Sequence, residues 1–108
     1  MLDDSTLTLA VSGATVLTAG QSGLTVLGNP TAATFAVTLP TAVGGDNVSF
    51  TIKNVGTANA VNVTPSGGQT IDGVAGLYAL AIPPGSFAAP SGIKVVAQGS
   101  AWSVVAKF

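Results

Sequence analysis

The stretch Val48–Gly73, VSFTIKNVGTANAVNVTPSGGQTIDG, decides the fold class of this 108-residue chain. Apolar and polar residues alternate through Val48–Lys53 and again through Val61–Thr64, which is the pattern of half-buried β-strands. Asn54–Thr57 separates the two runs, so we expect a β-hairpin whose second strand ends at Pro65. None of these residues is chemically reactive in that setting. The stretch therefore indicates a surface that packs against other protein copies.

The same alternation recurs along most of the chain and predicts further strands between turn residues. Gly99–Ser100 suits a two-residue loop, so the last two runs should pair as a closing hairpin. Ile71–Gly73 and Pro83–Ser86 mark further corners. We therefore expect an all-β chain that folds as a single small β-sandwich or jelly-roll-like domain. The additional predicted runs are Thr15–Thr18, Thr25–Gly28, Thr34–Leu39, Tyr78–Ile82, Ile93–Gln98 and Ala101–Phe108.

A chain of this length supports one domain with a two-layer core. We expect a short N-terminal arm over residues 1–8, ordered on a neighbouring subunit, and the β-sandwich domain over residues 9–108. The apolar faces of the alternating runs should supply the core. Its main expected members are Phe35, Phe50, Ile52, Val63 and Trp102.

Charged residues make up only 6% of the chain, against about 25% in typical soluble domains. The formal net charge is −1 and the mean hydropathy is +0.62, so charge does little to keep free copies apart. The 13 threonines and 9 serines leave open a monomer whose surface is hydrated by hydroxyl groups. We favour the other interpretation, in which neighbouring proteins cover much of the surface.

Composition also excludes several classes of protein. The chain has no cysteine and no histidine, which removes disulfides, thiolate metal sites and the commonest general base. Asp3 and Asp4 stand where a secretory signal needs positive charge, so we expect synthesis and use without export. The most apolar segment, Val74–Ile82, is about half the ~20 residues of a membrane helix. We therefore expect no membrane partner.

Two pairs of polar residues invite a chemical interpretation. Asp3 and Asp4 resemble a general acid and base, but adjacent carboxylates near a chain terminus have no fixed geometry. Asp46 and Asn47 supply oxygen ligands of the kind that calcium prefers, yet a calcium site needs six or more. Their side chains equally well bond their own backbone in a tight turn. We predict no metal site and no catalytic site.

Other candidates have simpler structural interpretations. Asp72 should shape a turn, with an ion pair to Lys53 as an alternative. Gly67–Gly68 resembles a phosphate loop, but no helix signal follows it, so we predict no cofactor. Tyr78 and Trp102 are aromatic residues able to stack on a sugar or a base, and we favour a core or interface role for both. Three lysines without arginine argue against nucleic-acid binding.

The order of the motifs is more specific than any one of them. Taken together, the motifs resemble a β-rich module of structural proteins in tailed bacteriophages, over roughly residues 34–105. That module occurs in tail appendages and in small head proteins. The motifs are Val37–Pro40, Phe50–Gly56, Val61–Pro65, Gly67–Gly73, Pro84–Ser86 and Gly99–Trp102.

The resemblance implies an all-β protein that assembles on the outside of a virion, usually as a homotrimer, and it carries over no catalytic residue. No shaft repeat or coiled-coil heptad precedes the module, which favours a capsid decoration or cement protein bound to the major capsid protein. Its expected location is the outer capsid surface, after synthesis in the host cytoplasm. The alternative is a tail fibre, tail tip or baseplate adhesin that presents Asn29–Ala33 or Gly67–Gly73 to a host glycan. An enzyme is the least favoured class.

Overall fold

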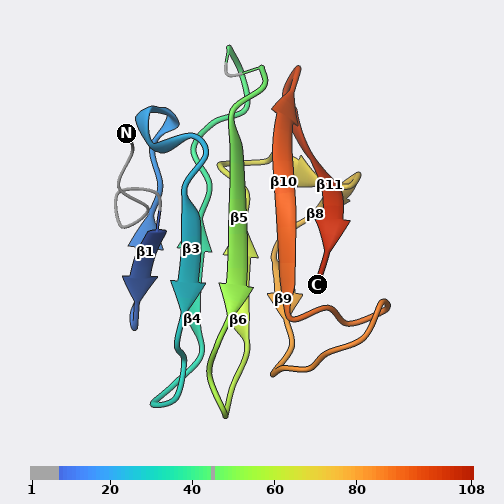
Figure 1. Ribbon diagram of the computed structural model, residues 1–108. Coiled ribbons are helices and arrows are strands. Elements are labelled where there is room, and N and C mark those ends of the chain that lie inside the picture. The colour runs from blue at the N-terminus through green and yellow to red at the C-terminus, as the bar shows by residue number, and fades with distance from the viewer. Residues whose placement is uncertain (1–7, 45) are drawn as a thin grey trace, which may run out of the picture.

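The computed structural model describes residues 8–44 and 46–108, and this part of the chain is built from strands (Figure 1). One short 3-10 helix, η2 (Ala19–Gln21), accompanies eleven strands in the described residues. The prediction of an all-β fold is confirmed. The strands are β1 (Thr8–Val11), β2 (Thr15–Val16), β3 (Thr25–Gly28), β4 (Phe35–Thr38), β5 (Ser49–Asn54), β6 (Val61–Thr64), β7 (Thr70–Ile71), β8 (Val74–Ala75), β9 (Tyr78–Leu80), β10 (Gly92–Gln98) and β11 (Ala101–Lys107).

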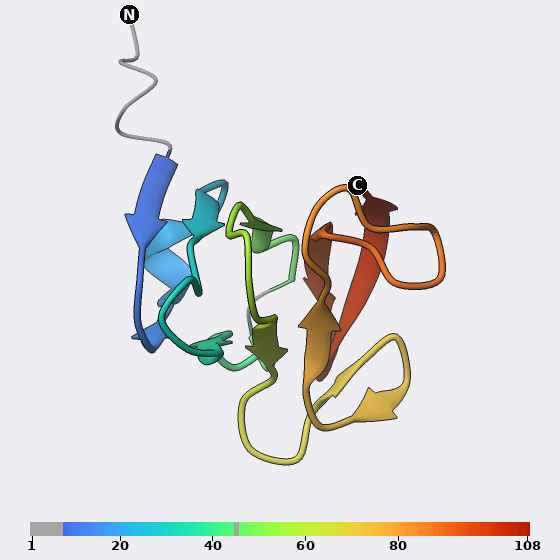
Figure 2. The ribbon, with the colours of Figure 1, turned by 90° about the horizontal axis from the view of Figure 1, so that it is seen from below.

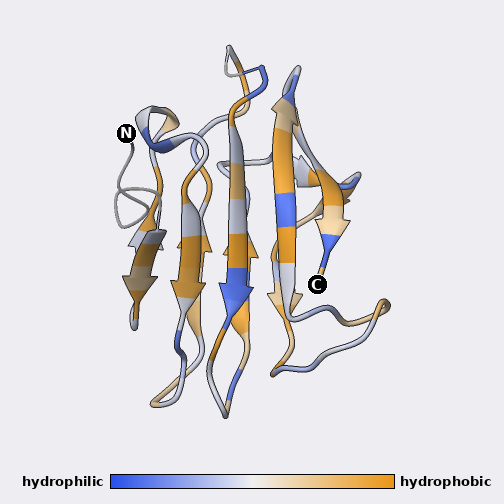
Figure 3. Ribbon diagram, viewed as in Figure 1, coloured by the Kyte–Doolittle hydropathy of each residue, from blue (hydrophilic) through white to orange (hydrophobic). Residues whose placement is uncertain are grey.

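The strands form two sheets, and the hydrophobic core draws buried side chains from both of them. The larger sheet has seven strands in the order β1-β3-β5-β10-β11-β7-β8, and the smaller has four in the order β2-β4-β6-β9. Figure 1 shows β4, β6 and β9 behind the larger sheet, and Figure 2 shows the arrangement from below. Few positions along the strands are hydrophilic (Figure 3), in keeping with the low charge content.

The first six strands wind as a coil. Strands β1, β3 and β5 are parallel neighbours in the larger sheet, and β2, β4 and β6 are parallel neighbours in the smaller one. The chain thus crosses between the two sheets five times between residues 8 and 64. We call residues 8–64 the coiled half. Its register stacks Val26 beside Ile52 and Val37 beside Val63, so each turn of the coil adds a layer to the same core.

The predicted hairpin between Val48–Lys53 and Val61–Thr64 is wrong. Both runs are strands, but β5 pairs with β3 and β10, whereas β6 pairs with β4 and β9. The connection crosses from one sheet to the other because the buried Asn54 side chain binds it there. Asn54 Oδ1 accepts from the backbone N–H of Gly56, and Asn54 Nδ2 donates to the carbonyl oxygens of Asn59 and Leu80.

Residues 70–108, which we call the closing half, are mostly antiparallel. The predicted closing hairpin is confirmed: β10 pairs with β11 so that Gln98 faces Ala101 across the two-residue loop. Gly99 has φ +67°, which suits the first position of that loop. The predicted corner at Ile71–Gly73 is also present, since β7 and β8 pair across Asp72 and Gly73 at φ 52° and 79°.

Most of the predicted core is buried. Phe50, Ile52, Val63 and Trp102 are each at most 1% exposed, and the Phe50 and Trp102 ring centroids lie 5.9 Å apart. Phe35 is only half-buried, although it packs against the core. Phe35 is the first residue of β4, at one end of that strand. Its Cζ lies 3.3 Å from where a Cβ on Gly28 would be. The ring therefore covers a glycine instead of entering the centre of the core.

The expected N-terminal arm over residues 1–8 falls outside the described residues, apart from Thr8, which begins β1. The expected domain over residues 9–108 contains the remaining strands and the core. Within residues 8–44 and 46–108, no helix is long and apolar enough to span a membrane.

Candidate functional site

The charged residues that the sequence singled out make structural contacts. Asp46 Oδ1 accepts a hydrogen bond of 2.8 Å from the backbone N–H of Gly99, which ties its loop to the turn between β10 and β11. Asn47 has φ 71°, a turn conformation that asparagine tolerates. Among the described residues, no three Asp, Glu, His or Cys side chains lie together as metal ligands would. Asp3 and Asp4 lie outside these residues.

Asp72 occupies the predicted turn and also anchors it. Its Oδ1 accepts a hydrogen bond of 2.8 Å from the backbone N–H of Val104 on β11. Lys53, the alternative ion-pair partner, donates from Nζ to Ser91 Oγ at 2.6 Å. Gly68, with φ 74°, belongs to the turn before β7, and a strand rather than a helix follows it. The geometry of a phosphate loop is therefore not present there.

The two aromatic candidates differ in exposure. Trp102 is 1% exposed and packs on Phe50, so its ring is a core element and does not face a sugar. Its indole Nε1 is buried, with no hydrogen-bond partner in the described part of the chain. Tyr78 is half-buried and lines a surface pocket. The structure thus contradicts sugar stacking by Trp102 and places Tyr78 at the edge of a possible contact surface.

The pocket beside Tyr78 has a volume of about 350 Å³. We call it the hairpin pocket, because the β7–β8 hairpin forms one wall and residues 88–90 form another. Val74 and Leu77, at 61% and 54% exposure, present apolar atoms around it, and Asp72 adds one carboxylate. The full lining is Ile71, Asp72, Val74, Gly76, Leu77, Tyr78, Ala79, Ala88, Ala89 and Pro90.

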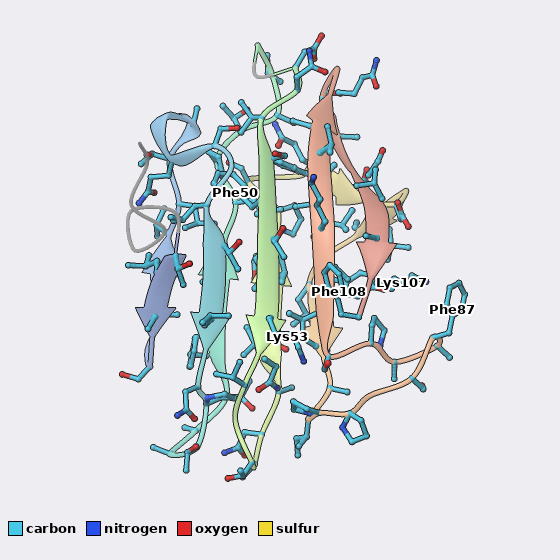
Figure 4. All side chains as sticks on the ribbon, viewed as in Figure 1. Phe50, Lys53, Phe87, Lys107 and Phe108 are labelled. Atoms are coloured by element: carbon cyan, nitrogen blue, oxygen red, sulfur yellow. The ribbon has the colours of Figure 1, made fainter. Side chains whose placement is uncertain are left out.

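Next to this pocket, Phe87 projects from the loop between β9 and β10 (Figure 4). Its side chain is 81% exposed, and Lys107 Nζ lies 4.3 Å from the ring centroid. Backbone hydrogen bonds from Gly85 to Ile82 and from Ser86 to Ala89 hold the loop. Hydrogen bonds therefore hold the loop that carries Phe87. The ammonium group of Lys107, on β11, already covers part of the ring.

Exposed apolar side chains are unevenly distributed between the two halves. Six of the nine large hydrophobic residues that are exposed in the described chain belong to the closing half. An aromatic ring in water is unfavourable unless a partner covers it, so this half is the candidate contact surface. The six are Val74, Leu77, Ile82, Phe87, Val105 and Phe108.

Sequence reasoning missed this surface. Alternation identifies residues inside strands, whereas Phe87 lies in the turn-rich segment Pro83–Pro90. The available signal was a phenylalanine between prolines, glycine and serine, where no strand or helix can bury it. Val74 and Leu77 were missed for a related reason, because they flank a tight turn and not a long strand.

Comparisons of the chain with protein-family models, with curated proteins and with solved structures found no match.

Proposed function

We propose that this chain is a virion structural protein, a capsid decoration or cement protein that binds the outer capsid surface of a tailed bacteriophage and stabilises the head. The order of motifs over residues 34–105 supports the phage context. The observation that carries the binding role is the set of exposed apolar side chains around Phe87 and the hairpin pocket. Such a surface serves contact between proteins.

The proposal includes no catalytic step, cofactor or metal. Catalysis requires reactive side chains held close together at a concave site. The polar side chains best placed for chemistry instead hold the fold: Asp46 and Asp72 accept backbone hydrogen bonds, and Lys53 donates to Ser91. The charged groups therefore support the scaffold, and the apolar groups are left for contact with partners.

The proposed mechanism is mass action. A protein that binds only the assembled capsid lattice lowers the free energy of that state, so opening the shell becomes less favourable. The partners would be the major capsid protein and further copies of this chain in a homotrimer, without nucleic acid or membrane. The site of action would be the outside of the head, after synthesis in the host cytoplasm.

A two-layer β-sandwich is the fold class that fits this role. Two sheets that share one core leave their outer faces and their connecting loops for contacts. The jelly-roll form of the proposal requires antiparallel strand pairs, which here occur mainly in the closing half.

A tail fibre, tail tip or baseplate adhesin that binds a host glycan is the second candidate. It is favoured by a pocket of about 340 Å³ lined by Ala10, Val11, Ser12, Leu27, Asn29 and Val55. One of the predicted glycan loops, Asn29–Ala33, begins at this pocket. Asn59 Nδ2 donates to the carbonyl oxygen of Pro30 at 2.8 Å, so the loop is held in place.

The deciding experiment mixes the purified protein with phage heads and, separately, with tails, and measures co-sedimentation. The protein should sediment with heads, and bound heads should release DNA at a higher temperature than bare heads. Phe87→Ser should reduce binding, whereas Val16→Ser, at a 72% exposed position in the coiled half, should not. Binding to tails alone, or retention on a glycan array, would support the adhesin instead.

A further inference from the structure

We propose that Phe87 of one copy inserts into the hairpin pocket of a neighbouring copy, with Lys107 beside the neighbour's Asp72. This contact deepens the proposed function, on which its biological setting rests, by naming the surfaces through which the copies join. It requires one projecting ring, one pocket that accepts a ring, and complementary charges on the two surfaces. The described residues supply all three features.

The projecting surface consists of Phe87 and Lys107. Phe87 is 81% exposed, the highest exposure of any large hydrophobic side chain in the described residues. The loop beneath it is closed by hydrogen bonds, including one from the backbone N–H of Ala89 to Ser86 Oγ at 3.1 Å. Because the loop is already ordered, little conformational entropy is lost when the ring is buried by a partner.

The receiving surface is large enough for that ring. Its volume is about 350 Å³, whereas an apolar cavity of about 150 Å³ can hold benzene. Apart from Asp72 and Tyr78, the lining residues have apolar side chains or, at Gly76, no side chain. A phenyl ring would therefore displace water from apolar surface and leave space for part of the lysine chain.

Charge complementarity indicates that the occupant is a second copy. Lys107 accompanies the ring, with Nζ 4.3 Å from its centroid, and Asp72 lines the pocket. The hydrogen bond from Val104 holds the Asp72 carboxylate at the pocket wall. When Phe87 enters a neighbour's pocket, its lysine thus arrives at a carboxylate, which favours this orientation over others.

A copy does not fill its own pocket. Residues 88–90 form one wall of the hairpin pocket, and the adjacent Phe87 remains 81% exposed. The ring is therefore available only to another molecule. A contact in which one surface meets a different surface on the next copy is head-to-tail, and it forms a closed ring when the rotation fits. A ring of three matches the proposed homotrimer.

The test uses engineered cysteines, because the chain has none of its own. Ala88→Cys, at an exposed position that keeps the neighbouring Phe87 ring, and Leu77→Cys are made in differently sized fusions, mixed under mild oxidation and resolved by non-reducing electrophoresis. A mixed disulfide between the two fusions should form. Ala88→Cys mixed with Val16→Cys is the control, since Val16 is exposed but belongs to the coiled half. Equal yields in the two mixtures would overturn the proposal.

Sedimentation equilibrium provides a second readout. Phe87→Ala should weaken association at least about 30-fold, the usual effect of losing a dominant interface residue, whereas Val16→Ala should not change it. Lys107→Gln should weaken association in the natural chain but not in an Asp72→Asn background, since the asparagine oxygen still accepts from Val104. A natural chain that stays monomeric, or equal effects of Lys107→Gln in both backgrounds, would contradict the contact.

The two proposals fail differently. If the protein binds heads but the cysteine pair does not form, the contact is wrong and the decoration function stands. If the cysteine pair forms but neither heads nor tails are bound, the contact stands and the decoration function is wrong.

Discussion

The coiled half and the closing half solve the problem of burying a core in different ways. In the coiled half, short parallel strands place similar residues beside each other in register, for example Val37 beside Val63. In the closing half, antiparallel strands cover the side of β5 and β6 and leave six large apolar side chains exposed. The first half thus supplies a regular column of strands, while the second closes that column and carries the candidate contact surface.

The two halves are joined through β5 and β6. Strand β5 pairs with β3 on one side and β10 on the other, and β6 lies likewise between β4 and β9. If the halves are one cooperative unit, damage at this junction should lower the stability of both together. The following substitutions test that view, beginning with the largest expected effect.

Phe50→Ala should lower the free energy of unfolding by roughly 3–5 kcal/mol, because it leaves a cavity against Trp102 at the junction. Urea denaturation followed by tryptophan fluorescence and by circular dichroism measures the loss. Val16→Ala is the control, and a change within about 0.5 kcal/mol is expected at that 72% exposed position outside the proposed contact between copies. Separate transitions in the two signals would show that the halves unfold independently.

Asn54→Ala should cost about 2–4 kcal/mol. It leaves the buried N–H of Gly56 and the carbonyl oxygen of Leu80 without the side chain that binds them. Asn62→Ala, on the half-exposed face of β6, should cost far less. Thermal unfolding of the two variants measures the difference. Equal midpoints would mean that the Asn54 side chain does not join the halves.

Gly56→Ala should cost about 1–3 kcal/mol, because its Cβ would lie 2.6 Å from Pro30 Cδ, on a loop of the coiled half. Gly67→Ala is the control, since a Cβ there meets nothing within 4 Å. Its effect should stay within about 0.5 kcal/mol. Denaturant melts compare the two, and a tolerated Gly56→Ala would show that the crossing between sheets has room to shift.

Added salt or a chelator should have the smallest effect on the thermal stability of both halves. The described lysine and aspartate contacts within the scaffold are to neutral groups, such as Ser91 Oγ and the Gly99 N–H. Raising sodium chloride from ~0.05 to ~1 M should therefore change the thermal midpoint little. A chelator should leave it unchanged as well. A fall of several degrees with chelator would indicate a calcium site, to be sought first at Asp46 and Asn47.

Much of the strand content could be predicted from the sequence, but not the way the strands connect. Alternation marked β5 and β6 because each buries one face, and Gly99–Ser100 specified the turn of the closing hairpin. The same alternation results whether two runs pair within one sheet or face each other from two sheets. The deciding interaction was the Asn54 side chain, and nothing in the sequence showed that it turns inward.

The candidate contact surface was harder to predict than the core. Core residues repeat every second position, whereas Val74 and Leu77 meet residues 88–90 only when the β7–β8 hairpin and the loop between β9 and β10 fold toward each other. Trp102 illustrates the easier case, because alternation predicted it as a core residue and it is 1% exposed. Spacing along the chain predicts which side of a strand a residue occupies, but it does not predict which loops meet.

Each turn of the coiled half also adds a fixed length to the protein. Each turn of the coil places one strand in each sheet, and neighbouring strands lie ~4.8 Å apart. A duplicated turn, equivalent to β3 and β4 with their connections, would pair on both sides with strands of the kind that β3 and β4 pair with now. The closing half would keep its pairing with β5 and β6 and its hydrogen bonds to the loop that precedes β5. Repeated duplication of such a turn would therefore lengthen the protein in fixed steps while the candidate contact surface stays the same.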